Sequence, residues 1–159
     1  MLNLEKVRND LREGLGDFRI DDLGDVFELT LPFYDYLNNS FKIYLTEFDN
    51  GIQVDDGGSI ITGPLVEDEK LIGKVISLCK TYRGYYDRLR HMVSVRAGIL
   101  ELSSRIIDHI HILVGICGFV RVFCMRRKDE SAEVLGNMVV RPVGVMANAA
   151  VEELQIESI

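Results

Sequence analysis

Apolar residues recur along this chain with two different periods, which predicts both helices and strands. Near the start, Leu4, Val7 and Leu11 are separated by three and four residues, as on one face of an amphipathic helix. We expect this helix over residues 3–14, with Asn3 as its N-cap. Its apolar stripe needs a partner surface, so the segment should pack onto the rest of the domain.

Between residues 26 and 55 the apolar positions alternate instead. The first apolar run is rich in strand-forming residues and is followed by Pro32, which limits ladder pairing and places that strand near a sheet edge by its end. Residues 41–46 alternate apolar and polar side chains, as in a half-buried strand. Asn50 and Gly51 suit a tight hairpin, after which the alternation resumes. The pattern therefore predicts a three-stranded antiparallel meander over 26–55.

A helical period returns after the meander. Acidic residues at 67–69 and Lys80 stand at the two ends that the helix dipole favours, and the apolar stripe between them predicts a helix over 66–82 that covers one face of the meander. Farther along, two apolar runs flank the turn residues at 97–98. They predict a second hairpin over 91–102 that extends the sheet.

Two interpretations fit residues 106–124. Apolar side chains at spacings of four and three predict a helix over 103–125 that is apolar nearly all round and must be buried on several sides. The abundance of Ile and Val, with a glycine at each end of 115–118, also suits a β-hairpin turning there. The helix is the expectation adopted for the fold.

These elements predict an α+β fold in which an antiparallel sheet packs against helices. We expect one domain over 1–128 and a C-terminal appendage over 129–159, with a strand-like stretch at 138–143 and a helix-like one at 147–154. The apolar residues of the appendage and of the buried helix find little room in a single domain. They predict self-association, most simply as a two-fold homodimer.

Charge is distributed unevenly along the 159 residues. The chain carries 25 acidic and 18 basic residues, a net charge of −7, but residues 1–70 alone hold 16 acidic and 6 basic ones. A net charge of −10 in the front half argues against that half lying on nucleic acid, and direct nucleic-acid binding is not expected. Such an acidic surface suits a basic protein partner.

The cysteines and the longest apolar run bear on location. Cys79, Cys117 and Cys124 lie in apolar surroundings without C-x-x-C spacing, which indicates reduced thiols in a cytoplasmic protein. The apolar stretch 112–120 is 9 residues long, against the roughly 18–20 that a membrane crossing needs. We expect neither a membrane span nor a cofactor.

Clustered carboxylates are the main candidate chemistry. Asp55 and Asp56, with Glu47 and Asp49 nearby and Asp35 as a further ligand, have the side chains that Mg²⁺ or Ca²⁺ prefers. The simpler interpretation is that Asp-Asp-Gly forms a turn, because Asp bonds to local backbone and Gly takes positive φ. Both stay open at this stage, the turn being favoured.

His109 and His111 are a second candidate. Two residues apart, they share one face of a strand but not of a helix, so only the hairpin interpretation makes them a zinc-ligand pair with Cys117 or Cys124. No strand offers the acid-x-Lys pattern of a metal-dependent nuclease, because Asp68-Glu69-Lys70 falls in the first turn of a helix. No catalytic constellation is therefore recognised.

The segment Leu29-Thr30-Leu31-Pro32-Phe33-Tyr34-Asp35, followed by Ile43-Tyr44-Leu45 and then by Asp55-Asp56-Gly57, resembles a family of uncharacterised prokaryotic and phage proteins. That family is a domain of unknown function with a T-P-F-x-D segment, a middle strand and a D-D-G turn. The resemblance covers roughly residues 20–125. This chain departs from it by inserting Leu31 before Pro32 and by continuing through 129–159. It implies an intracellular α+β domain of phages and mobile elements, with no activity to carry over.

The sequence thus predicts a non-enzymatic protein-binding module, a phage or mobile-element accessory or inhibitor acting on a nucleic-acid-handling host protein through an acidic surface. The alternative is a metal-dependent hydrolase or nuclease that uses the Asp-rich hairpin. The residues expected to matter are Asp21, Asp22, Asp25, Asp35, Asp55 and Asp56.

Overall fold

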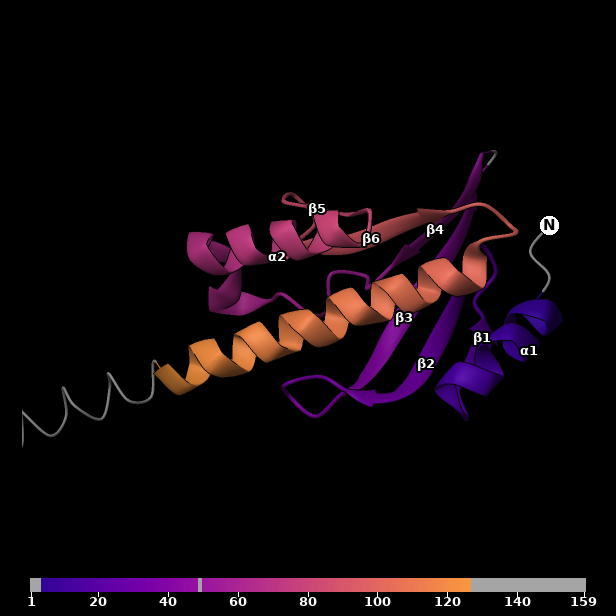
Figure 1. The fold of residues 1–159 in the computed structure, drawn as a ribbon, viewed down its shortest axis with the longest axis horizontal. Helices are drawn as coiled ribbons and strands as arrows, with labels where there is room; N and C mark the ends of the chain where they lie inside the picture. Colours follow the sequence, from indigo (N-terminus) through magenta and orange to yellow (C-terminus); the bar gives the residue numbers. More distant parts are fainter. Residues whose placement is uncertain (1–3, 49, 127–159) are drawn as a thin grey trace, which may run out of the picture. The chain divides into compact units, whose positions relative to one another are not determined.

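The computed structural model describes residues 4–48 and 50–126, and a six-stranded antiparallel sheet forms its centre (Figure 1). The strands lie in the order β1-β2-β3-β4-β6-β5. Their bounds are β1 Arg19–Asp22, β2 Val26–Tyr34, β3 Ser40–Phe48, β4 Gly51–Asp55, β5 Gly84–Asp87 and β6 Met92–Ala97. With helices packed on the sheet, this is the α+β fold that the sequence predicts.

The predicted meander over 26–55 is confirmed as β2, β3 and β4. Glu28 pairs with Tyr44, and Tyr44 pairs with Asp55 on the other side. At the β3–β4 turn Gly51 has φ +140°, and a Cβ there would lie 2.6 Å from the Ala97 carbonyl oxygen, so glycine is required for conformation and for space.

Pro32 lies within β2 rather than after it. The β2–β3 register shifts between Thr30 and Tyr34, where proline has no N–H to donate to the ladder. On its other side β2 pairs with β1 only from Phe27 to Thr30, so its end is at a sheet edge, as the sequence indicates.

Two strands differ from the sequence expectation. The second hairpin consists of β5 and β6 and not of 91–102: the side chain of Asp87 accepts hydrogen bonds from the backbone N–H of Leu89 (2.8 Å) and Arg90 (3.1 Å) and closes the turn. After β6 the chain turns, the Glu101 N–H donating to the Gly98 carbonyl, and enters a helix. β1 was not predicted, because Asp21 and Asp22 suggested a turn.

Three α-helices cover the described part of the sheet. α1 (Leu4–Leu15) and α2 (Glu69–Thr81) confirm the first two predicted helices. α2 begins later than expected, because a 3₁₀ turn, η1 (Gly63–Glu67), precedes it and the Asp68 carboxylate caps it by accepting from the Leu71 N–H at 2.7 Å. Figure 1 shows α2 beside the third helix, Leu102–Arg126, in agreement with the close approach of Leu78 to Gly115.

The long helix Leu102–Arg126 confirms the helical interpretation, and the hairpin alternative is wrong. Its Ile106, Ile112 and Ile116 side chains are fully buried. The Arg105 guanidinium donates to the carbonyls of Tyr82, Arg83 and Arg96 at 2.8–3.0 Å and ties the helix to the end of α2 and to β6. By length and composition alone this helix could cross a membrane, and 44% of its most apolar window is buried inside the protein.

The sheet has one apolar and one polar face. Leu29, Ile43 and Val54 are fully buried on the face toward the helices, where a Cβ added at Gly84 would lie 3.0 Å from the Ile112 side chain. The opposite face carries the alternate positions and is lined by polar side chains (Glu28, Lys42, Tyr44, Gln53, Asp55, Ser94, Arg96).

The chain divides into two compact units, residues 1–121 and 122–159. Within the second unit only 122–126, the last turns of the long helix, are described. The predicted appendage 129–159, with its strand-like 138–143 and helix-like 147–154, lies outside the described residues.

Candidate functional site

The Asp55–Asp56 turn is held by hydrogen bonds to the backbone around it. Asp56 is 0% exposed, and its carboxylate accepts hydrogen bonds from the N–H groups of Val93 (2.8 Å), Gly58 (3.2 Å) and Ile60 (3.2 Å). Desolvation raises its pKa to about 6, while these three hydrogen bonds act in the opposite direction. The residue joins the loop after β4 to β6.

Asp55 also accepts hydrogen bonds from nearby residues. Its carboxylate accepts from the Gly57 N–H at 2.9 Å and from the Gln53 side-chain amide at 3.0 Å. Its position in the register, opposite Tyr44 and Ser94, places it on the polar face of the sheet. Asp55 and Asp56 thus bind different donors, as the turn interpretation of Asp-Asp-Gly requires.

Asp35 organises the turn between β2 and β3. Its carboxylate accepts from the N–H groups of Leu37 and Asn39, both at 2.8 Å, and from the Asn39 side-chain amide at 3.2 Å. Asn38 between them adopts φ +68°, a left-handed conformation that Asn tolerates. Asp35 is 7% exposed and lies in a different loop from Asp55 and Asp56.

The remaining predicted residues belong to the β1–β2 hairpin. Asp21 forms an ion pair with Arg19 at 2.6 Å, and Asp22 accepts from the Gly24 N–H at 2.9 Å. Asp22 and Asp25 are both exposed, and Leu23 between them is 60% exposed. The six predicted aspartates therefore separate into three buried ones that hold turns and three on one hairpin.

Strand pairing brings the β1–β2 turn to the same end of the sheet as two other turns. Val26 pairs with Thr46 near the end of β3, and Ile52 at the start of β4 pairs with Ala97 at the end of β6. The turns at 22–25, 48–51 and 97–101 therefore share one end, which we call the three-turn end. Five adjacent strands reach it, so it is about 19 Å wide at the usual strand spacing.

The three-turn end combines exposed apolar and acidic side chains. Leu23, Phe48 and Leu100 are 60%, 57% and 88% exposed, and Ile99 is also exposed. Asp25 and Glu101 are exposed beside them. Asp25 is among the residues predicted from the sequence, whereas Glu101 and the exposed apolar residues are not, because the turns 48–51 and 97–101 become neighbours only through the pairing of β4 with β6.

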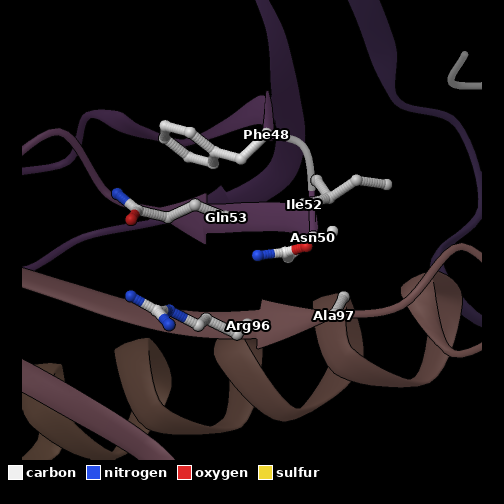
Figure 2. Close-up of a pocket in the computed structure, with 7 residues that line it drawn as sticks. Phe48, Asn50, Ile52, Gln53, Arg96 and Ala97 are labelled. Carbon is white, nitrogen blue, oxygen red and sulfur yellow. The ribbon is translucent and has the colours of Figure 1, made fainter.

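A hollow of about 330 Å³ borders this end (Figure 2). Figure 2 shows Gln53 and Arg96, which are paired on neighbouring strands, extending in the same direction, with Phe48 on the same side. Ile52 and Ala97 form part of its lining. The hollow thus continues the exposed surface of the three-turn end onto the polar face of the sheet.

The polar face itself is tied together by side-chain bonds. Lys42 donates a hydrogen bond to the Glu28 carboxylate at 2.8 Å. This hydrogen bond is the main reason why the pKa of Glu28 is lowered. The Tyr85 hydroxyl donates to the Gln53 side-chain oxygen at 3.1 Å, two strands away, so its ring crosses β6. These bonds favour a fixed surface.

The histidines do not form a metal site. His109 is fully buried, neither ring nitrogen has a hydrogen-bond partner, and desolvation lowers its pKa to about 3. His111 is exposed on another face of the helix, with its ring 5.4 Å from that of Tyr82. Within 4–48 and 50–126, no group of three or more His, Cys, Asp or Glu side chains is placed to hold a metal ion.

The cysteines are free thiols, and two of them are buried. Burial raises the pKa of Cys79 to about 12, so this thiol is unreactive. Cys124 is exposed, which corrects the expectation that all three lie in apolar surroundings.

Comparisons of the chain with family models, curated proteins and solved structures found no match.

Proposed function

We propose that the protein is a non-enzymatic protein-binding module that contacts a basic partner with its three-turn end. The observation that carries the proposal is that three turns meet there, each with an exposed apolar side chain (Leu23, Phe48, Leu100), and that two of them also carry exposed acidic residues, Asp25 and Glu101. Exposed apolar side chains surrounded by charged residues are typical of interaction sites. The apolar side chains stabilise the complex, and the charged residues steer the encounter of the partners.

A standard interface covers about 800 Å² on each partner, so a partner of ordinary size would cover this end, about 19 Å wide, together with the adjoining hollow. The roles of Asp35, Asp55 and Asp56 also favour binding over hydrolysis, because their carboxylates serve backbone and amide donors.

The partner that this surface suits is a protein with a basic patch. Nucleic-acid-handling proteins carry such patches, and the resemblance to a phage-associated family makes a host protein of that kind our proposed target. Homodimer formation through the remaining apolar surface is a separate proposal that light scattering of the full chain would test.

Site-specific photo-crosslinking tests the proposed surface. A photoreactive residue at Leu100 should capture a partner from the native host lysate, and one at Leu89, 94% exposed on the β5–β6 turn at the other end of the sheet, should not. The double charge reversal Asp25→Lys/Glu101→Lys should abolish capture. The matched reversal Glu5→Lys/Glu67→Lys, at exposed positions elsewhere, should leave it unchanged.

Equal capture from Leu100 and Leu89, or equal capture by the two double reversals, would contradict the proposal. Raising the salt concentration should slow association, because charges steer the encounter. A complex that forms equally fast at low and high salt would remove the acidic residues from the mechanism.

A further inference from the structure

A second hollow, of about 350 Å³, lies where α1 leads into β1, and it differs in charge from its surroundings. Three arginines, Arg8, Arg12 and Arg19, line it. They are half of the six basic residues in a segment, 1–70, that holds 16 acidic ones. A cluster of positive charge in an otherwise acidic segment therefore needs a physical explanation.

Arg8 and Arg12 are placed together at a cost to the helix. They are four residues apart and exposed on the same side of α1, an arrangement in which like charges repel. Within the described residues neither guanidinium has an acidic partner, and Val7 and Leu11 supply the packing of α1. The helix dipole favours Arg12 in the last turn, but it does not account for Arg8.

The third arginine and the backbone complete the hollow. Arg19 pairs with Asp21 through its Nε, at 2.6 Å, which leaves both of its terminal nitrogens able to donate. Gly16 has φ +71° and nothing within 4 Å of where a Cβ would stand, so a ligand can approach the backbone there. Asp17 and the half-buried Phe18 complete the lining. Asp17 is the one residue among those lining the hollow that carries a carboxylate.

We propose that this hollow binds the phosphate group of a small phosphorylated molecule. Planar guanidinium groups bind phosphate oxygens through paired hydrogen bonds, and the charge of a phosphomonoester suits several of them better than a carboxylate does. The volume is in the range of small-molecule sites, and the acidic surroundings disfavour a long polyanion. The site lies apart from the three-turn end, and its failure would leave the proposed binding function untouched.

Titration calorimetry of the full chain in phosphate-free buffer tests the site, with AMP as the probe because its adenine ring can lie on Phe18. We expect saturable one-to-one binding of AMP, and weakening by about tenfold or more in Arg8→Gln/Arg12→Gln. Arg90→Gln/Arg121→Gln removes two exposed arginines elsewhere and should bind within about twofold of the wild type.

Two further arms keep the test decisive. Arg8→Lys/Arg12→Lys retains the positive charge but loses the paired hydrogen bonds of the planar guanidinium groups. It should therefore bind AMP more weakly than the wild type and more tightly than Arg8→Gln/Arg12→Gln, and it tests the site even if the glutamine variant fails to fold. Absence of saturable binding of both AMP and inorganic phosphate at millimolar concentration, or equal AMP affinity in the wild type and both Arg8/Arg12 variants, would overturn the proposal. Binding of a short single-stranded oligonucleotide without binding of AMP would overturn it as well.

Discussion

Two Asp-rich turns of this protein have similar sequences and opposite environments. In Asp55-Asp56-Gly57 the carboxylates are nearly or fully buried and accept from backbone N–H groups and a side-chain amide, whereas in Asp22-Leu23-Gly24-Asp25 both carboxylates are exposed. The first turn follows β4, a strand in the middle of the sheet, and the second joins the edge strand β1 to β2. Position in the sheet therefore decides whether a carboxylate in such a turn is buried among backbone donors or faces solvent.

The largest effect is expected at Asp56. Asp56→Ala leaves the N–H groups of Gly58, Ile60 and Val93 without their acceptor, and it should lower the free energy of unfolding by about 3–5 kcal/mol. Asp56→Asn retains one acceptor oxygen and should cost less. Urea denaturation measures both, and a loss under about 1 kcal/mol for the alanine variant would contradict the structural role.

The pH dependence of stability should separate Asp56 from His109. The pKa of Asp56 is raised to about 6, so its contribution to stability is complete below pH 3.8 and is lost as the pH rises through 6. The pKa of His109 is lowered to about 3, so its contribution is complete above pH 6.5 and is lost as the pH falls toward 3. Between pH 4 and 6 the two oppose each other.

Removing either group should reveal the other. Relative to the wild type, the stability of His109→Leu should decline from pH 4 to pH 6, by up to about 3 kcal/mol, and that of Asp56→Asn should increase over the same interval. At pH 7 His109→Leu should also be more stable by about 1–3 kcal/mol, because it removes two buried nitrogens without partners. Parallel pH profiles for the two variants would refute this assignment.

A smaller loss is expected at Asp35, which holds a turn at the opposite end from Asp25. Asp35→Ala removes the acceptor of two backbone N–H groups and one side-chain amide whose residues, Leu37 and Asn39, are themselves exposed, and it should cost about 2 kcal/mol. Thermal unfolding followed by circular dichroism would show it. An unchanged melting temperature would mean that Asp35 contributes as little to stability as the exposed carboxylates do.

At the exposed turn the expectation reverses. Asp25→Lys/Glu101→Lys should change the free energy of unfolding by no more than about 0.5 kcal/mol, because neither side chain is buried. The same variant should lose the partner captured through Leu100. Destabilisation comparable to that of Asp35→Ala would mean that these carboxylates also support the fold.

The smallest effect concerns divalent cations. Because the Asp55 and Asp56 carboxylates already accept from backbone and amide donors, adding Mg²⁺, Mn²⁺ or Ca²⁺ should not raise the melting temperature. A rise that Asp56→Asn abolishes would instead favour a metal-dependent hydrolase.

Local pattern determined most of the elements. The alternation in 41–46, the Asn-Gly turn before β4 and the periodicity of α2 predicted the meander and its covering helix, because each signal lies within a few residues. The same is true of the long helix, whose repeat extends over 102–126. Where signals were short or mixed, as in the four-residue strands β1 and β5, residues of turn-like or ambiguous type concealed them.

The tertiary structure alone decided which distant residues meet. The order of the meander places the turns 22–25 and 48–51 at one end of the sheet, but only the pairing of β4 with β6 brings the turn 97–101 to the same end. Burial likewise separated Asp56 from Asp25, two residues of the same type in similar turns. The sequence determined the supply of carboxylates, and the fold decided which of them backbone donors would bind and which would face solvent, because hydrogen bonding and desolvation depend on neighbours in space.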